Sequence, residues 1–251
     1  MINFKVIVKP LLSHQSTLTK VWFFSTFSDS ASFLYFPKIP YLALKLHNML
    51  ILDSPTKYYS IAGYFEMEDV SETRNEFDNG TISEMAGGNL PHNVIKGEVF
   101  TFVNLAIKGQ IIPHMALNSD TKVRIEASNR FVYPDLTISD GTPEYYTTPE
   151  GVVRRDTIVN PLVIFEVLSE ATRNFDKGGK FEQYCAVPGF REYVLIEPEM
   201  VWVKSLYLHD PANNLWRHQI LSDRNDTLIL HSLGINILLD DLYTALDKLP
   251  K

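Results

Sequence analysis

The stretch from Pro161 to Leu168 is a run of apolar residues interrupted by a single carboxylate, Glu166. The run predicts a strand. An ionised carboxylate in such a strand is costly to remove from water unless a metal ion or a basic side chain meets it. Asp135 presents the same problem, because it follows Pro134 inside a β-branched and aromatic run. We therefore expect both acids at the ends of strands, where a positive partner can reach them.

Lys180, in the segment NFDKGGKFEQY, is a candidate for that positive partner. Hydrolysis of a phosphodiester needs a cation that neutralises the phosphoryl oxygens and lowers the pKa of the attacking water. Mg²⁺ does this through oxygen ligands. Two acids and a lysine at one edge of a sheet are therefore typical of a metal-dependent phosphodiesterase. The alternative is that Glu166 and Lys180 form only a buried ion pair, and the residues alone leave both interpretations open.

Several motifs follow one another in the order and spacing of a known family. They are NEFDNGTISEMAGG (75–88), His92 and Ile95, YPD (133–135), PLVIFEVLS (161–169), Asp176, Lys180, Tyr184 and REYVLIE (191–197). From about Tyr58 onwards the chain resembles the Uma-two endonuclease family, a branch of the PD-(D/E)XK restriction-endonuclease-like superfamily.

The resemblance implies an α/β fold with a restriction-endonuclease-like core, a central mixed β-sheet flanked by helices. It implies that Asp135, Glu166 and the backbone carbonyl of Val167 hold Mg²⁺ or Mn²⁺. Lys180 would orient the attacking water or stabilise the developing charge. The superfamily normally carries this lysine two residues after the second acid, where this chain has Leu168, so the role would have moved to Lys180.

Three more side chains are candidates for supporting this site. His92 shares the inward face of a predicted helix with Ile95, although a helix-terminal histidine bound only to backbone is equally consistent. Glu76 precedes a predicted turn and could reach the metal or a lysine, but an exposed hairpin acid is the simpler interpretation. Asp176 lies one helical turn before Lys180 and could hold it in place.

Tyr145, Arg154 and Arg155 lie between the two acid-bearing strands and are candidates for DNA contacts. Aromatic rings stack on bases and arginines bind phosphates. A solvated surface loop is the default interpretation of this segment. The sequence has no GxSxG, Walker, GxGxxG or HExxH motif, so serine hydrolases, nucleotide-driven motors, dinucleotide enzymes and zincins have no support.

Composition fits one principal domain, because 251 residues with 45% hydrophobic content can bury a single substantial core. The net charge of −7 argues against broad, sequence-independent coating of nucleic acid, but not against a nuclease with local basic patches. The single cysteine, Cys185, excludes an internal disulfide. No apolar run is long enough to span a bilayer, so we expect a cytoplasmic protein without a membrane partner. The sequence leaves open whether the protein forms a homodimer.

Residues 1–48 differ in composition from the rest, with five lysines, no arginine and one acid. We expect Met49 to be the natural start and residues 1–48 to be a non-native or disordered extension, which leaves 49–251 as the restriction-endonuclease-like domain. A transit peptide is the alternative, suggested by the scarcity of acids and weakened by the lack of arginine.

Periodicity and turn residues predict an α/β order of elements. Asn79-Gly80 predicts a tight turn, and Ile95, Val99, Phe102, Val103 and Ala106 predict one helical face. The predicted elements are a short helix at 58–66, a hairpin at 75–85, a helix around 95–106, strands at 121–127, 131–138 and 162–168, a helix at 176–185, a strand at 192–196 and an added C-terminal hairpin at 201–221 that turns at DPANN.

Together these features predict a Mg²⁺-dependent DNA endonuclease or nickase that hydrolyses phosphodiester bonds. The alternative is a catalytically inactive protein of the nuclease fold that binds DNA or another protein. The presence of Asp135, Glu166 and Lys180 together favours the enzyme.

Overall fold

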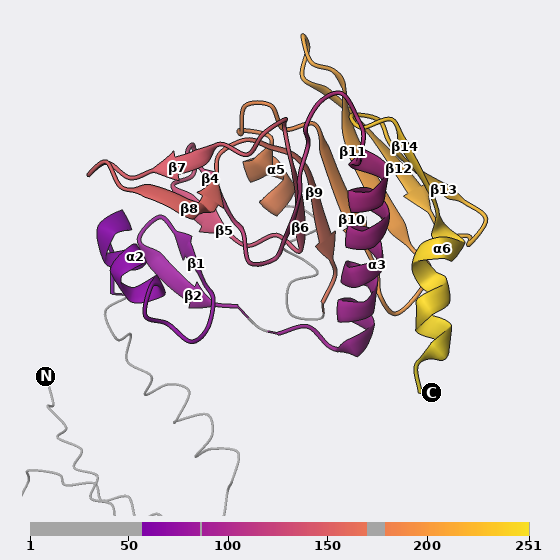
Figure 1. The fold of residues 1–251 in the computed structure, drawn as a ribbon, viewed down its shortest axis with the longest axis horizontal. Helices are drawn as coiled ribbons and strands as arrows, with labels where there is room; N and C mark the ends of the chain where they lie inside the picture. Colours follow the sequence, from indigo (N-terminus) through magenta and orange to yellow (C-terminus); the bar gives the residue numbers. More distant parts are fainter. Residues whose placement is uncertain (1–56, 86, 170–178, 251) are drawn as a thin grey trace, which may run out of the picture. The chain divides into compact units, whose positions relative to one another are not determined.

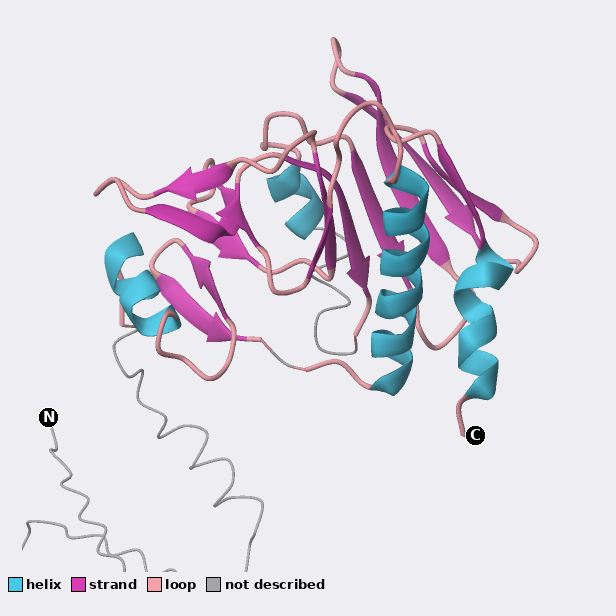
Figure 2. Ribbon diagram, viewed as in Figure 1, coloured by secondary structure: helices cyan, strands magenta, loops and turns pink. Residues whose placement is uncertain are grey.

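The computed structural model describes residues 57–85, 87–169 and 179–250. Within these residues the strands form two six-stranded sheets of mixed direction and one two-stranded sheet, with helices beside them (Figures 1 and 2). The first sheet has the order β2 (Thr81–Glu84), β1 (Asn75–Asp78), β5 (Arg130–Val132), β4 (Lys122–Ile125), β8 (Val153–Ile158) and β7 (Tyr145–Thr147). The second has the order β12 (Leu215–Leu221), β11 (Val203–Asp210), β10 (Glu192–Ile196), β9 (Pro161–Val167), β6 (Leu136–Ser139) and β3 (Ala116–Asn118). The third pairs β13 (Thr227–Leu230) with β14 (Ile235–Leu238), and the helices are α2 (Ile61–Glu68), α3 (Leu90–Ile107), α5 (Gly179–Tyr184), α6 (Leu239–Tyr243) and the 3-10 helix η1 (Thr244–Lys248).

β9 lies inside the second sheet, parallel to β10 and antiparallel to β6, and all of its residues are buried. From Val163 onwards its apolar side chains alternate between two apolar clusters. Val163 and Phe165 pack with residues of α3, whereas Ile164 and the following Leu168 pack with residues around α5. Because alternate residues of a strand share a face, Glu166 belongs to the side that α5 covers.

The predicted helix around residues 95–106 is present as α3, which lies along the second sheet (Figure 1). Asn89 caps its N-terminus, because its side chain accepts a hydrogen bond from the His92 backbone N–H (3.0 Å). The buried apolar residues of the helix are Ile95, Val99, Val103 and Ile107. Phe102 is half-buried and Ala106 is exposed, so the prediction for Ala106 was wrong. Ile107 is the buried residue of that turn.

The single strand predicted at 131–138 is two strands that belong to different sheets. β5 pairs with β1 and β4 in the first sheet, whereas β6 pairs with β9 and β3 in the second. Pro134 lies at the break, and a proline has no backbone N–H to give to a ladder. The expected single central sheet is therefore divided here, and the break places Asp135 at the start of β6.

Both predicted hairpins are confirmed. Asn79 and Gly80 have φ of 44° and 101°, which is what the tight two-residue turn between β1 and β2 requires. β11 and β12 form the C-terminal hairpin and extend the second sheet. The segment 139–156, interpreted by default as a surface loop, contains β7 and most of β8 instead, and β13, β14 and α6 were not predicted. No helix in the described part of the chain is both long enough and apolar enough to cross a membrane.

Candidate active site at the end of β6 and β9

Asp135 lies where β6 begins beside β9. The register pairs Leu136 with Phe165, so the next position brings Asp135 next to Glu166. Oδ2 of Asp135 accepts a hydrogen bond from the backbone N–H of Val167 (2.9 Å). That bond ties Asp135 to the residue after Glu166. The two predicted acids are thereby held at the same end of this strand pair.

α3 supplies two basic side chains to Asp135. His92 Nε2 lies 3.3 Å from Oδ2 and Lys96 Nζ lies 3.7 Å from Oδ1. Burial opposes ionisation of Asp135, but the hydrogen bond and charge of His92, the Val167 amide and Lys96 outweigh it and lower the pKa of Asp135. Burial also opposes ionisation of His92, yet the hydrogen bond and charge of Asp135 raise the pKa of His92. Both shifts favour the ionised pair.

The position of the His92 ring depends on Gly88. A Cβ atom added to Gly88 would lie 2.3 Å from Nδ1 of His92, which is closer than two such atoms can approach. Nδ1 is buried and finds no hydrogen-bond partner among the described residues. The ring is therefore positioned by close packing on a glycine and by its contact with Asp135.

Glu166 and Lys180 form a buried ion pair. Lys180 Nζ lies 3.2 Å from Oε1 of Glu166, and the two side chains are 8% and 5% exposed. Lys180 reaches Glu166 from α5, whose Tyr184 packs in the same apolar cluster as Leu168. Leu168 is fully buried in that cluster. An ammonium therefore reaches Glu166 from the helix, while the position two residues after the acid is used for packing.

The carboxylates at this end of the sheet suit a hard divalent cation. Mg²⁺ prefers oxygen ligands and usually keeps several waters, so one or two protein carboxylates are enough to hold it. Within the described residues, no group of three His, Cys, Asp or Glu side chains is placed to hold a metal ion. The resemblance implies that Asp135, Glu166 and the carbonyl of Val167 would hold such an ion.

A second polar cluster holds the backbone just before Asp135. The Tyr133 hydroxyl donates to Oε1 of Glu68 (2.5 Å) and accepts from Nζ of Lys122 (2.9 Å). Burial and the neighbouring Glu68 raise the pKa of Tyr133 well above its usual value, so the hydroxyl keeps its proton. Glu76 accepts a hydrogen bond from the Tyr133 backbone N–H (3.2 Å). Glu76 thus binds the chain two residues before Asp135.

The three predicted DNA contacts have different surroundings. The Arg154 guanidinium pairs with Asp69 and Asp156 and lies 4.1 Å over the ring of Phe65. The positive charge of Arg154 is therefore already paired within the protein. Arg155 and Tyr145 are exposed. The predicted supporting residue Asp176 lies outside the described residues.

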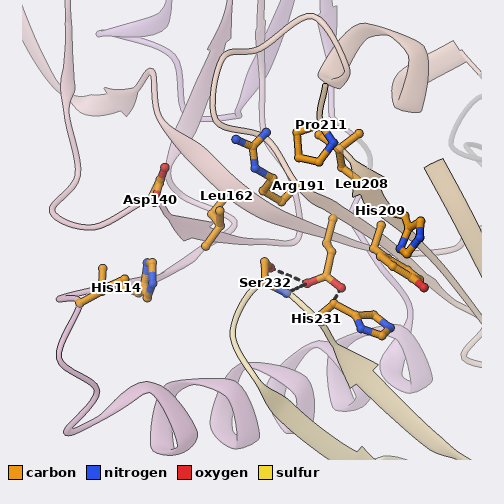
Figure 3. A pocket seen from close by; sticks show the side chains of 12 residues that line it. His114, Asp140, Leu162, Arg191, Leu208, His209, Pro211, His231 and Ser232 are labelled. Atoms are coloured by element: carbon orange, nitrogen blue, oxygen red, sulfur yellow. Dashed lines mark hydrogen bonds between the residues drawn. The ribbon is translucent and has the colours of Figure 1, made fainter. Parts of the chain in front are cut away.

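A cavity of about 500 Å³ opens at the opposite end of the second sheet. Figure 3 shows side chains that line it. The cavity is lined by Arg191 and Glu192 at the start of β10, whereas Glu166 lies near the end of the neighbouring parallel strand β9. Glu192 is fully buried, and its carboxylate accepts hydrogen bonds from the backbone and hydroxyl groups of residues 231–232. That carboxylate therefore anchors the turn between β13 and β14. The candidate active site is the carboxylate pair, because the cavity is far along the strands from it.

Comparison with known proteins agrees with the family resemblance of the sequence motifs. The model of the Uma2 family, described as "Putative restriction endonuclease", matches residues 61–240. The chain belongs to this family. Two relatives of this Uma2 protein are the uncharacterized proteins slr1290 and sll1609 of Synechocystis sp., each 28% identical, over 184 and 148 residues. The alignments cover 73% and 59% of this chain, and 90% and 80% of theirs.

A solved structure supports the fold. The crystal structure of a putative nuclease belonging to DUF820 from Anabaena variabilis matches with a TM-score of 0.58. The match covers 74% of this chain and 98% of that one, at 14% sequence identity. At this identity the likeness concerns the fold alone. The family membership predicted from the motifs is confirmed by the family match.

Sequence reasoning missed Lys96, which contacts Asp135, and the role of Tyr133, which holds the backbone two residues before Asp135. Lys96 lies one helical turn after His92, and the spacing that placed His92 on the inward face of α3 applies to it equally. Tyr133 was noticed only as part of the YPD motif. Its hydroxyl contacts come from α2 and β4, and no local pattern indicates them.

Proposed function

We propose that this Uma2 protein is a metal-dependent DNA endonuclease or nickase. The observation that carries the proposal is the hydrogen bond from the Val167 amide to Asp135, because it holds Asp135 beside Glu166 at one end of β6 and β9. Two carboxylates held together in this way suit Mg²⁺ or Mn²⁺. Membership of the Uma2 family, described as "Putative restriction endonuclease", supports a phosphodiester substrate.

Each side chain then has a role. Asp135 and Glu166 would hold the ion, which when bound neutralises charge on the phosphoryl oxygens and lowers the pKa of the attacking water. Lys180, beside Glu166, would orient that water or stabilise the developing negative charge. His92 would keep Asp135 ionised and in position, because it contacts the oxygen that also accepts from Val167.

The test is conversion of supercoiled plasmid to nicked or linear DNA with Mg²⁺, with Mn²⁺ and with EDTA. We expect conversion with either metal ion and none with EDTA. Asp135→Asn and Glu166→Gln should abolish conversion. Asp140→Asn is the matched control, because Asp140 is an exposed aspartate that follows the other end of β6, and it should keep activity. Full activity in Asp135→Asn, or no conversion by folded wild type with either metal, would remove the proposal.

One observation favours a second candidate, an inactive protein of the nuclease fold that binds DNA or another protein. Both carboxylates already have basic partners: His92 and Lys96 contact Asp135, and Lys180 contacts Glu166. Such pairs could serve stability alone. Under this second function the plasmid stays supercoiled in both metals, and neither Mg²⁺ nor Mn²⁺ raises the melting temperature.

A further inference from the structure

Two basic side chains, Lys96 beside Asp135 and Arg74 just before β1, meet at one serine. Lys96 Nζ lies 3.4 Å from the Ser119 hydroxyl oxygen, and Arg74 donates to the same oxygen (3.1 Å) and to the Ser119 carbonyl (2.7 Å). Ser119 follows β3 and is buried, and Arg74 immediately precedes β1. Three separate segments thus place two positive charges together, and Lys96 carries one of them to within 3.7 Å of Asp135.

These charges are accessible. The side chain of Lys96 is 27% exposed and that of Arg74 is 46% exposed. Arg74 also pairs with Asp120 (3.0 Å), whose side chain is 69% exposed. An exposed pair of this kind contributes little to stability. A phosphate, which accepts charge-assisted hydrogen bonds in the same way, can therefore replace Asp120 as a partner of Arg74.

We propose that Lys96 and Arg74, joined through Ser119, form a phosphate-binding rim for the DNA strand that lies at Asp135. The inference rests on the proposed function and names the surface that receives the substrate. A chain with a net charge of −7 repels nucleic acid on average, so binding needs local positive charge close to the acidic site. Arg154, one of the predicted contacts, is already paired with Asp69 and Asp156.

Backbone contacts of this kind position a duplex without reading its sequence. The rim therefore makes a quantitative prediction about salt. Each phosphate contact adds about 0.9 to the slope of log Kd against log salt concentration for duplex DNA. Lys96→Gln and Arg74→Gln should each lower the slope by about one, and the double variant by about two. Two duplexes of unrelated sequence should show the same losses.

The experiment is fluorescence anisotropy of a labelled duplex titrated with wild type and variants in EDTA, at several salt concentrations. Arg191→Gln is the matched control, because Arg191 lines the cavity at the opposite end of the sheet (Figure 3), and it should keep the wild-type slope. Lys96→Arg keeps the charge and should also keep the slope. Melting temperatures establish that each variant is folded. Arg74→Gln alone still tests the rim should Lys96→Gln not fold.

The outcomes separate this inference from the proposed function. Wild-type slopes in both rim variants, or an equal loss in Arg191→Gln, would overturn the rim, as would a wild-type protein with no measurable affinity for the duplex. The plasmid assay then tests the nuclease proposal separately. Cleavage by the same wild-type preparation leaves the nuclease proposal intact, whereas absence of both binding and cleavage removes both proposals.

Discussion

Removal of the Lys180 ammonium should destabilise the protein strongly. Lys180 and Glu166 are 8% and 5% exposed and lie 3.2 Å apart. Lys180→Met keeps the volume of the side chain but leaves a carboxylate buried without this partner. Breaking one side of a buried pair typically costs about 3–5 kcal/mol, a large share of the roughly 5–15 kcal/mol that stabilises a domain. Lys180→Met/Glu166→Gln should lose less than the single variant, because no net charge then stays buried at this pair.

The assay is urea unfolding followed by tryptophan fluorescence, with a double-mutant cycle over Lys180→Met and Glu166→Gln. We expect the two changes to be coupled by more than about 1 kcal/mol, as is found for residues in direct contact. A loss below about 1 kcal/mol in Lys180→Met, or changes that simply add, would refute the buried pair. The unfolding measurements are also needed for the cleavage assay, because the activities of Lys180 variants can be compared only at equal concentrations of folded protein.

Three further outcomes follow from the same contacts. Mg²⁺ or Mn²⁺ at a hundredfold excess over Kd should stabilise the fold by about 2.7 kcal/mol, and equal shifts of melting temperature in wild type and in Asp135→Ala/Glu166→Gln would exclude this metal site. Gly88→Ala should push the His92 ring away from Asp135 and cost about 1–3 kcal/mol. NMR titration should then find the raised pKa of His92 falling towards its usual 6.5, whereas an unchanged pKa would contradict the contact. Burial opposes ionisation of Asp156, but hydrogen bonds from its lysine and arginine partners lower its pKa below 3.8. At a pH between the lowered pKa of Asp156 in the folded protein and its ordinary value of 3.8 in the unfolded chain, the native state binds fewer protons than the unfolded state. The ionised Asp156 therefore stabilises the fold above pH 3.8, and this contribution is lost as the pH falls below 3.8. The difference in free energy of unfolding between wild type and Asp156→Asn should therefore shrink in acid, and a difference independent of pH would refute the argument.

Local patterns predicted the elements that depend on neighbouring residues. The turn at Asn79-Gly80 needs two residues that accept positive φ, and the helical face around Ile95 needs only a repeated spacing. The apolar run around Glu166 likewise indicated a buried strand from consecutive residues alone. The prediction of one strand at 131–138 was wrong because β propensity continues across Pro134 while the hydrogen-bonding partners change.

Two features could be predicted from the chain alone: that two carboxylates lie in apolar runs, and that the chain belongs to the Uma2 family. Both rest on the order of residues along the chain. The partners of those carboxylates depend on how the sheets and helices pack. His92 and Lys96 of α3 and the Val167 amide of β9 contact Asp135. Arg154 forms ion pairs with Asp69 and Asp156. These contacts join segments far apart in the chain, and their distances are set by how the sheets and helices pack, which no local periodicity encodes.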